Sequence, residues 1–147
     1  MSEVAEIKEF KKAEEVLSKG NAKNVLQKML DYYEIDIDDI EDKEMKKAIK
    51  QGYDRLVKAT RFGRLKVNFD NGIEVIQTTR ANKTEIKYRE IDGVAKTEMA
   101  GKDPNDNYGK AYALMGALSG LGEGAIKQLK GVDLSLAEVL GFIFLSV

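Results

Sequence analysis

The stretch RLKVNFDNGIEV, residues 64–75, decides the fold class of this sequence. Apolar residues alternate with polar ones on both sides of the tripeptide Asp70-Asn71-Gly72. An alternation of period two predicts two β-strands, and a tripeptide of turn-forming residues between them predicts the turn that joins them. The stretch therefore predicts an antiparallel hairpin.

The register of this hairpin follows from the need for one apolar face. A three-residue loop pairs Phe69 with Ile73 and Val67 with Val75, whereas a two-residue loop mixes apolar and polar side chains on the same face. We therefore predict a type I turn in which Gly72 is left-handed and forms a bulge. A third strand is expected within residues 84–91.

The rest of the chain shows helical spacing, with apolar residues every three to four positions. A lone hairpin is marginal in water, so it must pack on these helices. We predict an α+β fold, mainly helical, with a small antiparallel hairpin or three-stranded meander between the N- and C-terminal helical segments. A helical region over 1–62 and a hairpin-plus-helix module over 63–147 are expected to form one compact domain. Helices are predicted from Val4 to Lys19 with Gly20 as the stop, from Asn21 or Asn24 to Tyr33, from Asp39 or Asp42 to Arg61, over 93–100 after a capping Asp92, over 108–119, over 125–130, and from Ser135 to the end.

The composition excludes several kinds of chemistry. The 147 residues contain no Cys, His or Trp, which rules out disulfides, zinc sites built from Cys and His, thiol nucleophiles and relays that need a histidine. We expect a protein that is not an enzyme and has no cofactor. The start, MSEVAEIKEF, carries acids where a signal peptide needs bases, so we expect the cytoplasm and no membrane partner.

Charge is balanced overall, 24 basic against 25 acidic residues, but it is segregated along the chain. Residues 31–44 hold eight acids, and residues 46–66 hold eight bases. The two blocks can neutralise each other. Alternatively, one arc of the helix after Asp42 is a phosphate-binding face, which makes a nucleic-acid-binding accessory or regulatory protein the alternative function. The residues of this alternative nucleic-acid site are Lys46, Lys47, Lys50, Lys58 and Arg61.

Two short motifs resemble ligand sites and are rejected. The string GLGEGA, residues 120–125, fits a dinucleotide fingerprint, but the segment before it has helical spacing and too few residues follow. It is interpreted as a turn between helices. The string DPNDN, residues 103–107, starts like a calcium loop, but the required Gly is Tyr108 and the required Glu is Leu114.

The C-terminal third is poor in charge and rich in apolar residues and glycine. Its last helix is apolar nearly all round, so it is either the core of its own domain or a contact surface for a partner helix or an oligomer. The residues that we predict to bind a partner are Tyr108, Tyr112, Met115, Leu118, Leu136, Val139, Leu140, Phe142, Ile143 and Phe144.

The order of features from Leu65 to Leu145 resembles a known family. After the hairpin come YREIDG (88–93), a helix that ends LSGL (118–121), then IKQL (126–129), Val132-Asp133 and a terminal apolar helix. This order is similar to that of the tail assembly chaperones of long-tailed phages, in particular the small Mu-like and P2-like proteins. The resemblance implies a non-catalytic protein that works in the host cytoplasm. It implies that the chain binds the helical tape-measure protein and helps to recruit tail-tube subunits, with self-association possible.

Overall fold

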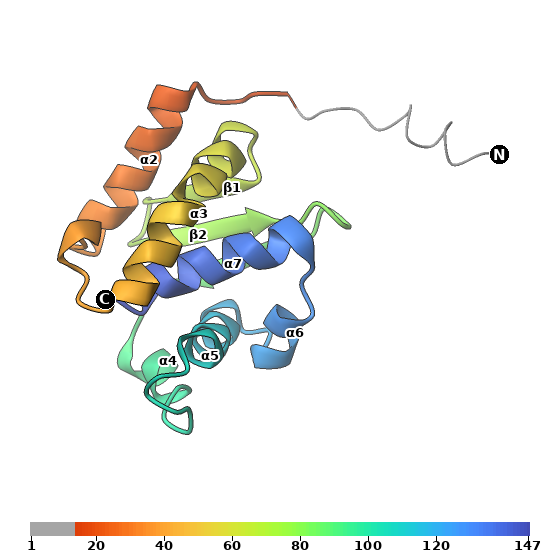
Figure 1. Ribbon diagram of the computed structural model, residues 1–147. Helices are drawn as coiled ribbons and strands as arrows, with labels where there is room; N and C mark the ends of the chain where they lie inside the picture. Colours follow the sequence, from red (N-terminus) through yellow and green to blue (C-terminus); the bar gives the residue numbers. More distant parts are fainter. Residues whose placement is uncertain (1–13) are drawn as a thin grey trace.

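The computed structural model describes residues 14–147 and has the α+β fold that the sequence predicts (Figure 1). A three-stranded antiparallel sheet stands between two groups of helices, as expected. The elements, in chain order, are α2 (Lys19–Tyr32), the short 3-10 helix η1 (Ile37–Asp39), α3 (Lys43–Arg61), β1 (Leu65–Asn68), β2 (Glu74–Thr78), β3 (Glu85–Arg89), α4 (Gly93–Thr97), α5 (Asn107–Ser119), α6 (Glu123–Lys127) and α7 (Gly131–Phe144).

The sheet has the strand order β1-β2-β3 and the predicted hairpin register. Val67 lies opposite Val75, and Gly72 is left-handed with φ 80°. The third strand buries Ile86 and Tyr88 on one face and exposes Glu85, Lys87 and Arg89 on the other. The hairpin, the left-handed Gly72 in its turn and the third strand are therefore confirmed.

One apolar residue of the hairpin does not join the buried face. The paired segments end before the Phe69–Ile73 position, and Phe69 is 37% exposed while Ile73 is buried. The ring of Phe69 lies 6.3 Å from that of Tyr32, at the end of α2, with Lys28 Nζ 5.8 Å from its centroid. Phe69 therefore lies at the surface, in the turn of the hairpin and beside α2.

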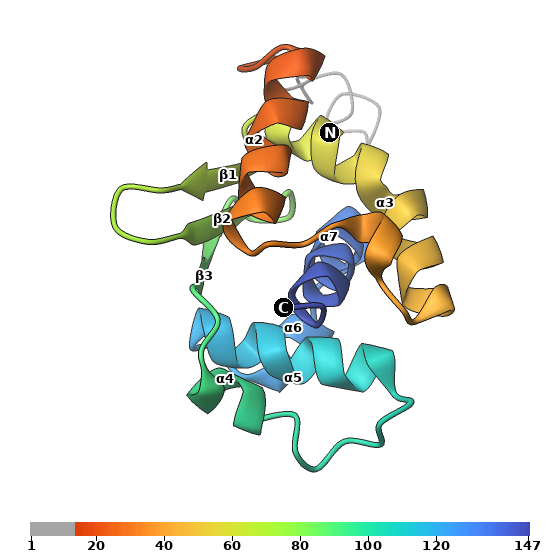
Figure 2. The same cartoon turned by 90° about the vertical axis from the view of Figure 1, so that its left-hand side faces the viewer.

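Helix α7 runs through the middle of the molecule, between α3 and α5 (Figures 1 and 2). On one side Gly52 of α3 faces Val139, and a Cβ at Gly52 would overlap the valine side chain. On the other side Gly141 faces Ala111 and Met115 of α5 in the same way. Small residues thus let three helices approach closely, and Leu26 of α2 joins the same core.

A buried carboxylate fixes the start of α7 against the sheet. Asp133 is 4% exposed, and its side chain accepts hydrogen bonds from the backbone N–H of Arg80 (2.9 Å) and of Ala81 (3.4 Å). Its backbone carbonyl accepts a bond from the Gln77 side chain at 2.8 Å, and the Tyr88 hydroxyl donates to Gln77 at 2.8 Å. The loop between β2 and β3 is therefore held on α7 by a chain of satisfied polar groups.

Two predicted helix boundaries are wrong. The stop at Gly20 is in fact inside α2, because Ser18 caps the helix by accepting a hydrogen bond from the Asn21 N–H at 3.1 Å. The part of the first predicted helix over residues 4–13 lies outside the described residues. The last helix begins at Gly131 and not at Ser135, since Glu138 bonds to Tyr112 of α5 and not to a cap.

The predicted cap of the second helix at Asn21 or Asn24 is also wrong, because both residues lie inside α2, and α6 begins two residues before the predicted start at Ala125. The predicted starts at Asp42 and Asp92 are confirmed. Asp42 caps α3, and Asp92 caps α4; each carboxylate accepts a bond from the N–H three residues on. Within residues 14–147, no helix has the length and apolar character needed to cross a bilayer.

Candidate partner-binding groove

Most of the residues predicted to bind a partner are in the core. Helix α7 packs on both α3 and α5, so its apolar side chains face inward on all sides. These residues are not available to a partner in this conformation, and for them the core interpretation is the correct one. The eight buried residues are Met115, Leu118, Leu136, Val139, Leu140, Phe142, Ile143 and Phe144.

The other two predicted residues lie where α5 meets α7. Tyr108 is 53% exposed, and its ring meets that of Phe142 edge-on at 5.1 Å. Tyr112 is half-buried, and its hydroxyl donates a 2.5 Å hydrogen bond to Glu138. Burial, together with the bond to this carboxylate, raises the pKa of Tyr112 above its ordinary value. Tyr112 thus links α5 to α7. Of the ten predicted residues, Tyr108 is the one with a largely exposed side chain that a partner could contact.

A concave surface lies elsewhere, between α4, α5 and the turn that leads into α6. It is an open groove of about 470 Å³. Its walls carry both charged and apolar side chains, and its floor is the side of α5 that faces away from α7. The lining residues are Arg89, Val94, Ala95, Glu98, Lys102, Ala113, Gly116, Ala117, Gly120, Gly122 and Glu123.

The floor is shaped by glycines. Gly116 has no side chain, so the backbone of the turn that leads into α6 packs directly on α5. The Gly122 N–H donates a hydrogen bond to the Gly116 carbonyl at 3.1 Å. Gly120 ends α5 in the left-handed conformation with φ 72°. Ala113 and Gly116 are buried, so the part of the floor that reaches the surface is at Ala117 and Gly120.

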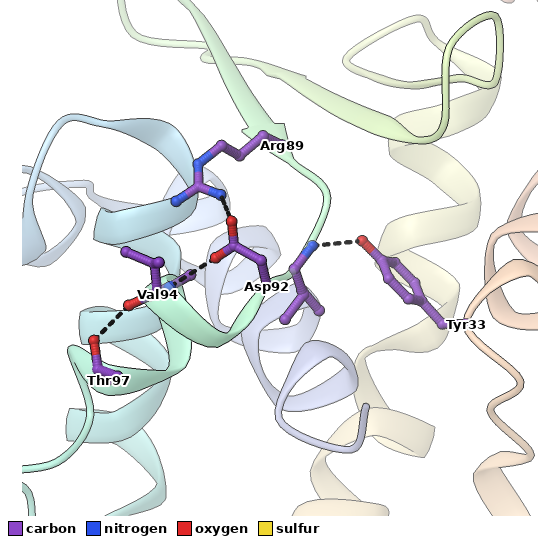
Figure 3. Close-up of polar contacts among 7 residues, drawn as sticks. Tyr33, Arg89, Asp92, Val94 and Thr97 are labelled. Carbon is purple, nitrogen blue, oxygen red and sulfur yellow. Dashed lines mark hydrogen bonds and ion pairs between the residues drawn. The ribbon is translucent and has the colours of Figure 1, made fainter.

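The α4 wall is held in place by a set of polar contacts at its N-terminus (Figure 3). Asp92 accepts a hydrogen bond from the Ala95 N–H at 2.8 Å, and Arg89 pairs with the other carboxylate oxygen at 2.8 Å. The pKa of Asp92 is lowered, first by the backbone bond and then by Arg89. The Ile91 N–H donates to the Tyr33 hydroxyl at 3.3 Å, which ties the wall to the end of α2.

One exposed apolar residue lines the groove, and a second lies between two of its lining residues, Gly120 and Gly122. Val94, on the α4 wall, is 70% exposed, and Leu121, in the turn, is 55% exposed. One end of the groove is spanned by an ion pair of 2.5 Å between Lys102 and Glu123. Lys127 adds a longer contact of 3.5 Å to the same carboxylate. The hydrogen bond from Lys102 is the main cause of the lowered pKa of Glu123.

The predicted nucleic-acid site is largely occupied by internal contacts. Lys50 forms a 2.6 Å ion pair with Asp38, and Lys46 donates to the carbonyl of the same residue at 2.7 Å. Arg61 pairs with Glu15 at 3.2 Å. Neutralisation of the basic face by the acidic block is therefore confirmed at Asp38. Within residues 14–147, the two predicted residues that have no such partner are Lys47 and Lys58.

The string GLGEGA has the structural role expected of it. Gly120 caps the end of α5 and Gly122 precedes α6, so the segment joins two helices and follows no strand. In the described part of the chain, no three acidic side chains come together in a way that could hold a metal ion.

The groove was missed by the sequence analysis, although a signal for it is present. The small residues of α5 that form the floor recur at spacings of three and four, on the side opposite Leu114 and Leu118. The large apolar residues of this helix dominate its pattern, so the face formed by the small residues does not stand out in the sequence. The exposed Val94 belongs to a helix too short for a periodic pattern.

Comparison of the chain with known protein families, with curated protein sequences and with solved structures finds no match. The groove is therefore interpreted from its own residues.

Proposed function

We propose that this protein is a non-catalytic binding protein that holds a helical segment of a partner in the groove between α4 and α5. The observation that carries the proposal is a concave surface with an exposed apolar residue, Val94, in its lining and a second, Leu121, between the lining residues Gly120 and Gly122. Such residues gain about 1.5–3 kcal/mol each when they are fully buried, which gives a partner a reason to bind here.

The concave floor fits a partner helix better than a flat surface would. Ala117 and Gly120 have small or no side chains and reach the surface, so the backbone of a second helix can approach the end of α5 closely there. The rim of the groove carries Arg89, Glu98 and Lys102, which match a polar flank on either side of that stripe. This is the helix-in-groove mode of recognition, in which apolar anchors provide affinity and a charged rim provides specificity.

The resemblance suggests which partner this is. Two of its motifs lie at the groove: YREIDG runs into the cap of α4, and LSGL ends at the exposed Leu121. This placement supports the proposal that the protein is a phage tail assembly chaperone. Its partner is then the tape-measure protein, whose apolar helices it keeps from aggregating, and tail-tube subunits are recruited to that complex.

Co-expression with a tape-measure protein tests this function. The wild type is expected to raise the soluble fraction of that protein and to co-purify with it. Val94→Lys places a charge in the groove and is expected to abolish both effects. Val16→Lys is the matched control, because Val16 is 62% exposed, lies beside Gly63 after α3 and does not line the groove.

The controls separate binding from folding. Both valines are exposed, so neither lysine variant is expected to lose the wild-type circular dichroism spectrum. If the wild type leaves the tape-measure protein insoluble and no complex elutes, the proposed function is wrong. If Val94→Lys binds as well as Val16→Lys, the protein binds through another surface.

A further inference from the structure

The segment that forms the α4 wall of the groove has almost no core. Of residues 93–106, which we name the strap, only Ala95 is buried, and only Met99 and Lys102 are half-buried. Figure 2 shows the strap as α4 followed by a loop that hangs below α5. A segment with so little buried apolar surface has little to hold it down beyond polar contacts.

Both ends of the strap are anchored. At its start, Asp92 caps α4 and is paired with Arg89. At its end, Asp106 caps α5 by accepting a 2.8 Å hydrogen bond from the Gly109 N–H. These caps define where a movement of the strap begins and ends.

Between its ends the strap is tied down mainly by lysines. Lys102 pairs with Glu123 across the groove at 2.5 Å, and Lys96 donates to the carbonyl of Val147 at 2.8 Å. Pro104 accepts a bond from a third lysine, Lys110 of α5, also at 2.8 Å. Of these contacts, only the Lys102–Glu123 pair joins the two walls of the groove.

We infer that the strap opens and closes over the groove as one unit, with the Lys102–Glu123 ion pair as its latch, while the rest of the fold stays closed. Opening removes the α4 wall and widens the channel along α5, so that a partner helix can enter. Closing then packs Val94 against that helix. The link to a partner rests on the proposed function, whereas the movement itself is a property of the free protein.

Hydrogen exchange of the free, full-length protein tests the movement. The reporting amides are those that bond to carbonyls of the strap or of its cap, including Lys96 to the Asp92 carbonyl and Lys102 to the Met99 carbonyl. A five-residue helix detached from α5 does not hold its turns in water, so these bonds break when the strap opens. They are expected to exchange faster than the amides of α5 and α7 and with one common opening equilibrium. Lys102→Gln is expected to speed all of them by about three- to five-fold, the size of effect that a half-exposed ion pair has.

Lys127→Gln is the matched control. It removes the same charge from beside the same carboxylate of Glu123, but Lys127 belongs to α6 and lies outside the strap. In Lys127→Gln the amides of the strap are expected to exchange at the wild-type rate. The inference is wrong if both variants behave alike, if the strap exchanges only as slowly as α7, or if Lys102→Gln affects Met99–Lys102 but not Lys96, which would mean simple fraying.

The two proposals fail separately. If the strap opens as described but the protein binds no tape-measure protein, the proposed function is wrong and the inferred movement of the strap is unaffected. If the complex forms through Val94 but the strap amides show no opening of their own, the proposed movement of the strap is wrong and the proposed function is unaffected.

Discussion

Gly116 offers the sharpest test of how the groove is built, because an added methyl group there meets backbone and not a flexible side chain. A Cβ at this position would lie 2.8 Å from the Glu123 Cα and closer still to the Gly122 carbonyl carbon and the Glu123 nitrogen. Neither α5 nor the turn can yield by rotating a side chain. Gly116→Ala must therefore push the turn off the helix.

The magnitude follows from three contributions. Overpacking costs about 1–3 kcal/mol, and loss of the bond from the Gly122 N–H to the Gly116 carbonyl costs about 0.5–1.5 kcal/mol. Replacing glycine within a helix returns up to about 1 kcal/mol. We expect a net destabilisation of about 2 kcal/mol, which lowers Tm by roughly 4–8 °C for a chain of this size. The displaced turn also carries Glu123 away from Lys102, so partner binding should weaken.

Urea unfolding followed by circular dichroism measures this change, and Gly124→Ala is the control. Gly124 lies in α6 with nothing within 4 Å of an added Cβ, so that variant should match or slightly exceed the wild type in stability. The slope of the free energy of unfolding against urea should stay unchanged in both. A Gly116→Ala protein as stable as Gly124→Ala would refute the packing of the turn on α5.

Three further predictions concern other parts of the molecule. In the wild type, loop N–H groups meet the Asp133 carboxylate, and Asp133→Asn turns an amide donor toward them. Urea unfolding should show a free energy of unfolding lower by about 1–3 kcal/mol, and an unchanged midpoint would contradict the buried set of hydrogen bonds. Asp38→Asn releases Lys50 from its ion pair, so the variant should elute from heparin at higher salt than the wild type; strong retention of the wild type itself would favour the nucleic-acid alternative. Burial raises the pKa of Tyr33 to about 12 from 10.0, so the folded state keeps this tyrosine neutral. Its contribution to stability is complete below pH 10 and is lost as the pH rises from 10 towards 12, which a lower Tm in that range would show and an unchanged Tm would exclude.

The features that local sequence determines were predictable. The hairpin register follows from matching Val67 with Val75, and the caps at Asp42 and Asp92 need only a carboxylate placed before a helix. The terminal helix was also recognised as one that must be buried. These patterns depend on neighbours within a few positions along the chain.

The features that long-range packing determines were not predictable. Whether α7 is core or interface depends on α3 and α5, which reach it through Gly52 and Ala111 from far along the chain. The start of α7 was misplaced because Asp133 bonds to a loop more than fifty residues away. The groove needed the turn at Gly122 to fold back on α5, which no local pattern announces.

Amide chemical-shift mapping tests the central claim, that a partner helix lies in the groove between α4 and α5. The probe is a helical peptide from a tape-measure protein, titrated into the isotope-labelled full-length chain. The account predicts that the largest shifts fall on residues 93–102 and 113–123, with Val94 and Leu121 among them, and that Val94→Lys removes them. Shifts that fall instead on α3, around Lys47 and Lys58, with residues 93–123 unchanged, would contradict it.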